Sequence, residues 1–197
     1  MFGVPIELIK KGNPEYALRQ KGKVAELALG YQGSTGALIN MGALDMGIPE
    51  EDLPDIVSRW REANKRIRDL WYSMDNAAVQ VITQGGSVGI NGLLLAREYD
   101  YNQGTDCFTI QLPSGRKLYY VSPGIGENQW GNPSISYMGM DQKTKRWKRI
   151  ETYGGKLVEN ITQAIARDCL AISMQRVAAL GYNIVICLLY TSDAADE

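Results

Sequence analysis

The sequence predicts an α+β fold that is mainly helical and carries a small antiparallel β meander. Two observations support this prediction. Apolar residues recur at helical spacing of three and four through much of residues 15–81 and again through residues 156–180. Between these regions, short runs with β-rich composition are separated by turn signals. A helical part is therefore expected beside a small sheet.

Composition limits the class of protein. The chain has 197 residues, of which 22% are charged and 45% apolar, as in an ordinary soluble globular protein of one or two domains. No histidine is present, which removes the commonest general base and the Ser/His/Asp triad. The 3 cysteines are widely spaced, so we expect a reducing compartment. No signal peptide or bilayer-length apolar run is evident. We expect a cytoplasmic protein without a membrane partner.

The first predicted helix covers about residues 15–31, with Pro14 suited to its first turn and a glycine-rich break following it. It carries four side chains at a strict spacing of four, namely Arg19, Lys23, Leu27 and Tyr31. Each step of four drifts by only about 40°, so these side chains form a shallow spiral on one side. Two cations, an aliphatic and an aromatic could hold an anion and a flat ring, as in a nucleotide. An amphipathic helix with a solvated basic face is the alternative.

Two more helices are predicted before the sheet. Residues 37–46 form a short one, which Gly47 and Pro49 end. Residues 50–81 form a long one with a continuous apolar stripe, and acidic residues fill its first turn, where the helix dipole favours them.

The meander is predicted from four runs, at residues 87–90, 93–99, 107–112 and 117–121. Residues 123–139 are rich in Gly, Pro, Asn and Ser, so we expect an irregular loop there.

Charge is unevenly distributed along the chain. The net charge is -1, but residues 142–156 hold six cations and one acid, a local +5. With Trp147, the basic run 143–149 could bind a nucleic-acid backbone electrostatically. An exposed loop is the alternative.

The last helix is predicted at residues 156–180, opened by Gly154 and Gly155 and ended by Gly181. One face carries a polar stripe of Asn160, Gln163 and Arg167. Amides and a guanidinium donate to base edges and sugar-phosphate oxygens, whereas a hydrated helix face is the alternative. Residues 183–189 suit a buried strand.

A catalytic centre is not visible. Asp168 has no acidic partner near it in sequence, and no residues have the spacing of a metal site or an acid/base pair. We therefore predict no metal ligand in this chain.

The ordered motifs resemble those of a known family. The pattern Arg-x3-Lys-x7-Tyr of Arg19, Lys23 and Tyr31 is similar to motif B, the fingers-domain helix of family A DNA polymerases, and the string from residue 18 to 33 resembles the phage and prophage branch. The helix from Trp60 to Trp71, the Ser-Gly-Arg-Lys-Leu-Tyr-Tyr hairpin from Ser114 and the Gln-x4-Asp helix at residues 159–168 follow in the family's order. The resemblance covers residues 1–185.

The resemblance implies a role for each residue of the spiral. Arg19 and Lys23 would face the triphosphate of the incoming deoxynucleotide, and Lys23 would protonate the departing pyrophosphate. Tyr31 would guard the nascent base pair. Leu27 stands where the family usually has Phe or Tyr against the sugar. Further along, Arg116, Asn160 and Gln163 would touch primer or template DNA, and Arg167 of the polar stripe is predicted to join them.

The resemblance also divides the chain. Residues 1–81 would be a helical fingers segment, 82–150 the meander and basic loop, and 151–185 a helix and strand of the palm. Residues 186–197 look foreign, like a translated adapter or junction. The family's carboxylates for Mg²⁺ come from motif A, upstream of Met1, and from motif C, a His-Asp-Glu turn that this sequence lacks after Val185.

The function implied is that of a fragment of a template-directed DNA polymerase, expected to be monomeric and to bind deoxynucleotides and primer–template DNA. Mg²⁺ would be the cofactor of the full-length parent, and the 197-residue chain itself is expected to be inactive. The alternative is a non-catalytic nucleic-acid-binding or interaction module.

Overall fold

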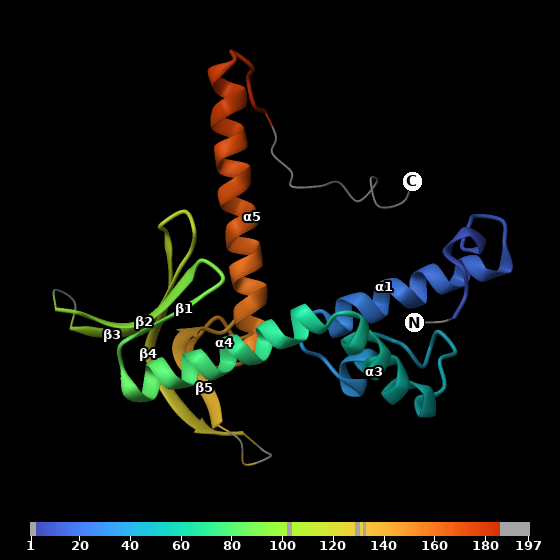
Figure 1. Ribbon diagram of the computed structural model, residues 1–197, viewed down its shortest axis with the longest axis horizontal. Helices are drawn as coiled ribbons and strands as arrows, with labels where there is room; N and C mark the ends of the chain where they lie inside the picture. The colour runs from blue at the N-terminus through green and yellow to red at the C-terminus, as the bar shows by residue number, and fades with distance from the viewer. Residues whose placement is uncertain (1–2, 102–103, 129–130, 132, 186–197) are drawn as a thin grey trace. The chain divides into compact units, whose positions relative to one another are not determined.

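The structure, a computed structural model, describes residues 3–101, 104–128, 131 and 133–185 (Figure 1). These residues form two compact units. The first consists of the residues up to Asn76 together with Tyr153–Val158. The second consists of Ala77–Thr152 together with the described residues from Glu159 onward.

The first unit is helical. Its α-helices are α1 (Ala17–Leu29), α2 (Thr35–Asn40), α3 (Leu53–Ala63) and the first part of α4 (Lys65–Gln84). Short 3-10 turns occur at Ile6–Leu8, Pro14–Tyr16 and Glu50–Asp52. The apolar stripes of these helices meet in one core, in which the rings of Trp60 and Trp71 stack with centroids 5.7 Å apart. Burial of these large side chains is the main stabilising contribution to this unit.

The long helix predicted at residues 50–81 is wrong in one respect, because Asn64 interrupts it. Asn64 leaves the helical conformation, with φ -114° and ψ 42°, and its side-chain amide donates to the carbonyl oxygen of Trp60 (2.9 Å). The apolar stripe continues across the break, which is why periodicity alone did not reveal it.

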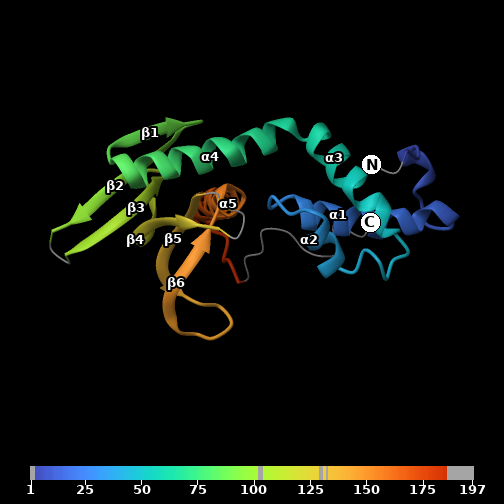
Figure 2. The same ribbon diagram turned by 90° about the horizontal axis from the view of Figure 1, so that it is seen from below.

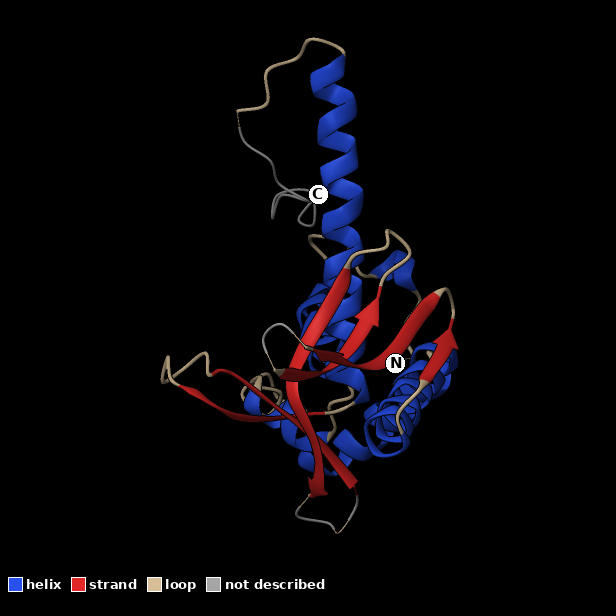
Figure 3. Ribbon diagram, turned by 90° about the vertical axis from the view of Figure 1, so that its left-hand side faces the viewer, coloured by secondary structure: helices blue, strands red, loops and turns tan. Residues whose placement is uncertain are grey.

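The second unit contains a twisted antiparallel sheet of six strands in the order β1-β2-β3-β4-β5-β6 (Figure 3). The strands are β1 (Ser87–Ile90), β2 (Leu93–Asp100), β3 (Thr105–Gln111), β4 (Lys117–Glu127), β5 (Pro133–Met140) and β6 (Trp147–Thr152). Sequential neighbours pair throughout, so the predicted meander is confirmed and is larger than expected.

The irregular loop predicted at residues 123–139 is wrong, since most of it lies in β4 and β5. The register shifts between Val121 and Gly124, and Ser122 adopts a φ of 49° there. This irregularity lets Pro123 follow inside a strand without breaking the pairing beyond it. Pairing with neighbouring strands overrides the loop-like composition of this segment.

The sheet has one side covered by helices. Cross-strand partners Arg97, Phe108 and Tyr120 share this side. Arg97 donates to the carbonyl oxygen of Ile82 in α4, and Tyr120 accepts from Asn160 in α5. The C-terminal part of α4 and the helix α5 thus lie on the same side of the sheet (Figure 2). The alternate residues of the strands point to the opposite side.

Helix α5 (Gly154–Ala179) begins at the predicted glycine pair and ends before Gly181, whose φ is 86°. Most of its residues beyond 170 are exposed. The predicted strand at 183–189 is not formed over residues 183–185, which are exposed and irregular, and the rest of it lies outside the described residues, as does the foreign-looking segment 186–197.

Together the described residues contain five α-helices and one six-stranded antiparallel sheet, which confirms the mixed fold class. None of these helices is both long and apolar enough to span a bilayer.

Candidate functional site

The spiral predicted on the first helix lies on the solvent side of α1. The opposite side of α1 is buried through Val24, Ala25, Ala28 and Leu29. Lys23 is exposed, as are Leu27 (44%) and Tyr31 (41%), whereas Arg19 is half-buried. Among the described residues, no ion pair involves Lys23. We call Arg19, Lys23, Leu27 and Tyr31 the α1 stripe; it offers a cation, an aliphatic and an aromatic side chain to a ligand.

Tyr31 stands in the turn after α1, and the start of α5 holds this turn in place. Gln32 adopts a φ of 66°, and its Oε1 accepts a hydrogen bond from the backbone N–H of Gly155 (2.7 Å). A Cβ at Gly155 would lie 2.8 Å from the carbonyl oxygen of Tyr31. Glycine is therefore required there for α5 to approach the end of the stripe so closely.

Asp75 of α4 binds Gly154, the residue before Gly155 at the start of α5. Its Oδ1 accepts from the N–H of Gly154 (2.9 Å), and a Cβ at Gly154 would lie 1.9 Å from the carbonyl oxygen of Trp71. Burial raises the pKa of Asp75, and the hydrogen bond from Gly154 opposes that change. Gln32 and Asp75 thus satisfy two amides at the N-terminus of α5 that have no partner within the helix. Sequence reasoning identified Gly154 and Gly155 as a helix start but missed both partners, which are distant along the chain.

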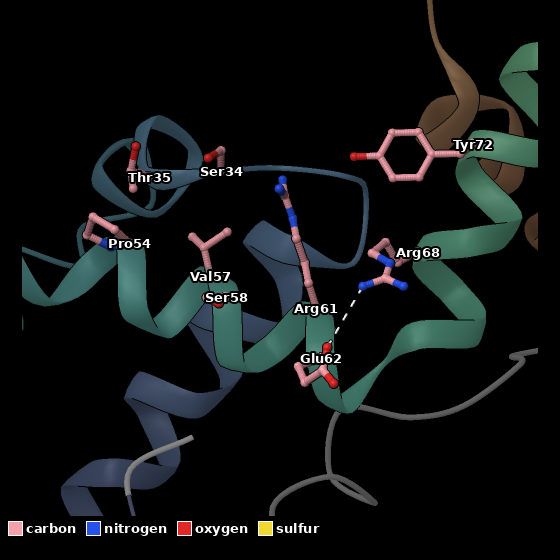
Figure 4. A pocket seen from close by; sticks show the side chains of 9 residues that line it. All are labelled: Ser34, Thr35, Pro54, Val57, Ser58, Arg61, Glu62, Arg68 and Tyr72. Atoms are coloured by element: carbon pink, nitrogen blue, oxygen red, sulfur yellow. Dashed lines mark ion pairs between the residues drawn. The ribbon is translucent and has the colours of Figure 1, made fainter.

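A pocket of about 460 Å³ lies between α2, α3 and α4 in the same unit (Figure 4). Arg61 points into it and donates to the carbonyl oxygen of Gly33 (3.1 Å), while Arg68 lies 3.9 Å from Glu62. Ser34 and Tyr72 add hydroxyl groups to its walls. Arg68 also pairs with Asp69 (2.8 Å), so Arg61 and the hydroxyl groups are the donors that this pocket offers to an anion such as a phosphate. Sequence reasoning missed this pocket, because the interruption at Asn64 brings its two arginines to face one space.

The four residues predicted to touch DNA come together in the second unit. Arg116, Asn160, Gln163 and Arg167 line one open groove of about 460 Å³, with Tyr120 and Tyr137 on its sheet side. Arg116 enters from the turn before β4, and the other three come from one face of α5. We call it the α5 groove.

The groove is held by its own ion pair. The Arg116 Nε donates to Asp168 Oδ1 (2.8 Å), and its Nη2 donates to the carbonyl oxygen of Ala164 (3.0 Å). The Ser114 hydroxyl donates to the other oxygen of Asp168 (2.6 Å). The hydrogen bond from Ser114, followed by that from Arg116, lowers the pKa of Asp168. The Gln-x4-Asp motif is thereby tied to the Ser-Gly-Arg hairpin, from which it is distant in sequence.

The two amides of the groove are also hydrogen-bonded. Asn160 Nδ2 donates to the hydroxyl oxygen of Tyr120 (3.1 Å), and Gln163 Nε2 donates to Glu159 Oε1 (3.1 Å). Burial raises the pKa of Tyr120 to about 12, so its hydroxyl stays neutral and accepts the bond from Asn160 at any physiological pH.

Neither surface provides a metal site. Across the described part of the chain, no three His, Cys, Asp or Glu side chains gather where a metal ion could be held. The Mg²⁺ that the resemblance implies for the longer protein would therefore be held by residues other than these.

Comparison with known proteins finds similarity to a phage protein. The chain is 48% identical over 188 residues to the DNA polymerase of Bacillus phage SP02, a match that covers 94% of this chain. The chain spans 28% of the length of that protein. No family model matches the chain, and no solved structure matches it either. Nearly the whole chain is thus similar to part of a phage protein named DNA polymerase.

Proposed function

We propose that this chain is a segment of a template-directed DNA polymerase of family A, phage type, which adds deoxynucleotides to a primer 3′ end. The observation that carries the proposal is the 48% identity to the phage SP02 DNA polymerase across 94% of this chain. The order of the motifs, from the α1 stripe to the α5 groove, supports the assignment to family A. Residues 1–81 belong to the fingers and residues 151–185 to the palm.

The α1 stripe binds the incoming deoxynucleoside triphosphate. Arg19 and Lys23 bind its phosphates, and the Lys23 ammonium donates the proton that the departing pyrophosphate needs. An exposed lysine without a carboxylate partner suits this role, because its charge is not already neutralised. Leu27 packs against the sugar, and Tyr31, held by the Gln32 and Gly155 contact, lies against the new base pair.

The α5 groove binds primer or template DNA. Arg116 and Arg167 supply positive charge, and Asn160 and Gln163 supply amide donors. The ion pair between Arg116 and Asp168 makes the net positive charge of the groove lower than that of two unpaired arginines. This lower charge favours contacts that position DNA over contacts that only attract it.

The partners of the longer protein follow from this proposal: primer–template DNA, deoxynucleotides, and Mg²⁺ bound by residues other than those described in this structure. We further propose that it acts as a monomer in the cytoplasm of the host cell.

The first experiment separates chemistry from binding. Lys23→Ala in a polymerase that contains this segment at full length is expected to lower the rate of the chemical step in single-turnover extension more than it lowers DNA affinity. A loss of about 100-fold in rate is typical when a proton donor is removed. Equal losses in rate and DNA affinity would make Lys23 a DNA contact instead.

The second experiment uses the 197-residue chain, which we expect to bind a deoxynucleoside triphosphate weakly and to extend no primer. Lys23→Ala should weaken that binding in equilibrium dialysis, while Lys21→Ala should not. Lys21 is a matched control, because it stands on the same helix but lines a different pocket, with Asp52 and Asp55. Salt-dependent DNA binding without any triphosphate binding would favour the alternative of a nucleic-acid-binding module.

A further inference from the structure

The side of the sheet away from α4 and α5 has its own chemistry. A row of cross-strand partners crosses five strands on this side, namely Glu98, Cys107, Val121, Met138 and Arg149. Directly paired residues share a side, and these alternate with Phe108 and Tyr120 of the helix-covered side. We call this side the open face.

Three large side chains stand exposed on the open face. Tyr119 of β4, Met140 of β5 and Trp147 of β6 each lie two residues from the row, toward the same end of the sheet. Their exposed fractions are 62%, 50% and 57%, whereas Phe108 and Tyr120 on the other side of the sheet are buried. Large exposed side chains that lie side by side on three adjacent strands are costly to leave in water, which indicates a binding surface.

Positive charge adjoins these rings. The turn between β5 and β6 carries Lys143, Lys145 and Arg146, and among the described residues no carboxylate forms an ion pair with them. Arg149 adds a fourth cation on the open face itself.

The turn is ordered by its own hydrogen bonds. Asp141 accepts from the backbone N–H groups of Lys143 (3.1 Å) and Thr144 (2.6 Å), and its other oxygen pairs with Lys148 (2.8 Å). The negative charge of Asp141 is therefore balanced by Lys148 and by the hydrogen bonds of the turn. Lys143, Lys145 and Arg146 remain available to solvent or a ligand.

The acidic groups of the open face lie away from the turn between β5 and β6: Glu98 and Asp100 are on β2, and Glu151 is at the far end of β6. Glu98 pairs with Lys117 (2.7 Å), and both Glu98 and Asp100 line a cavity of about 540 Å³ beside Tyr119. A polyanion would be repelled from the β2 end and attracted to the β5–β6 turn, so its binding is confined to β4, β5 and β6.

We propose that the open face of the sheet binds single-stranded DNA, with bases stacked on Tyr119 and Trp147 and phosphates neutralised by Lys143, Lys145, Arg146 and Arg149. Stacking on a protein ring needs an unpaired base, which a duplex does not offer. The cations match the phosphates, whereas an apolar protein partner would leave them unpaired. This site goes beyond the proposed function, because Trp147 and its four cations belong to neither the α1 stripe nor the α5 groove, and only Tyr119 also lines the groove.

The test measures fluorescence anisotropy of a labelled oligodeoxythymidine of about 16 nucleotides, titrated with the 197-residue chain at several salt concentrations. Trp147→Ala should weaken binding by at least about 5-fold, since stacking contributes roughly 1–3 kcal/mol per base. Trp147→Phe should restore most of the affinity, because the ring remains. Trp147 is largely exposed, so neither variant removes core packing, and circular dichroism checks the fold.

A triple variant tests the cations. Replacing Lys143, Lys145 and Arg146 by Gln should reduce the slope of log K against log salt by about 2, since each neutralised phosphate of a single strand contributes roughly 0.7. The matched control replaces Lys10, Lys11 and Arg66 of the first unit, which are exposed cations, by Gln and should leave the slope nearly unchanged.

Three results would overturn the proposal. One is binding that neither Trp147→Ala nor the triple variant weakens. Another is a duplex of the same length that binds as tightly as the single strand, which would indicate only a basic patch. The third is no DNA binding at low salt. Triphosphate binding through Lys23 is measured in a separate experiment. A failure of the open face to bind DNA therefore leaves the proposal for the α1 stripe testable, and the reverse also holds.

Discussion

The α1 stripe and the α5 groove are both polar surfaces on helices, but their side chains are held in opposite ways. In the groove, Arg116 is fixed by Asp168 and Ala164, and Asn160 is fixed by Tyr120. On the stripe, Lys23 is exposed and has no ion pair among the described residues, while the turn at Tyr31 is held by the hydrogen bond between Gln32 and Gly155. The side chains of the α5 groove are therefore ordered before a ligand binds, whereas Lys23 of the α1 stripe would be ordered by its ligand.

This difference has an energetic meaning. Groups that already hydrogen-bond to one another lose little side-chain entropy on binding, but their charge is partly neutralised. A solvated lysine must be ordered by its ligand, yet it brings its full charge. The groove is suited to positioning a long polymer, and the stripe is suited to a small, highly charged molecule.

The largest expected effect is a loss of stability when the close packing at the start of α5 is disrupted. Gly154→Ala should destabilise the chain by about 2 kcal/mol or more, because the new Cβ would lie 1.9 Å from the Trp71 carbonyl oxygen and must displace α4 or α5. Urea unfolding measures the change. Gly22→Ala is the control: a Cβ there meets nothing within 4 Å, so alanine should stabilise α1 by roughly 0.5–1 kcal/mol. Equal effects at the two glycines would contradict the close approach of α5.

A smaller effect distinguishes fixed from solvated cations. Arg116→Gln should cost about 1 kcal/mol of stability, since it removes hydrogen bonds to Asp168 and Ala164 at a half-exposed site. Lys23→Gln should change the free energy of unfolding by less than about 0.5 kcal/mol, as expected for a surface residue without partners. Paired urea melts measure both, and a larger loss for Lys23→Gln would show that the stripe is also structural.

The smallest effect is a pH dependence of opposite sign at two carboxyl groups. The pKa of Asp168 is lowered in the folded chain, so its contribution is present above the unfolded pKa of about 3.9 and is lost as pH falls through the folded value. The pKa of Asp75 is raised in the folded chain, so its charged form opposes folding at neutral pH. This penalty shrinks as pH falls below the pKa of Asp75 in the folded chain, and it is gone below its pKa in the unfolded chain.

Melting temperatures from pH 7 to pH 3 test this pair. Asp168→Asn should melt below the parent chain at pH 7, and the gap should narrow in acid. Asp75→Asn keeps an oxygen acceptor for Gly154 and should melt at or above the parent at pH 7, an advantage that vanishes in acid. The same sign at both positions would contradict the two environments.

Local sequence patterns predicted the secondary structure correctly where local residue preferences alone determine it. The helix from residue 15 follows from Pro14 and from the apolar spacing, and the structure places its regular part at Ala17–Leu29. The strands at residues 87–121 follow from their turns. Pattern failed where tertiary pairing decides, as in β5, whose glycine, proline and serine content resembles a loop until β4 and β6 flank it.

The sequence by itself determined that Arg19, Lys23, Leu27 and Tyr31 share one side of a helix, because helical geometry fixes that spacing. It also grouped Asn160, Gln163 and Arg167 on α5 for the same reason. Only the tertiary structure brought Arg116 to Asp168, closed Gln32 and Asp75 over the start of α5, and exposed Trp147 beside Met140 on the open face. Such contacts join residues far apart along the chain or on adjacent strands, and they depend on packing and strand register, which local periodicity does not encode.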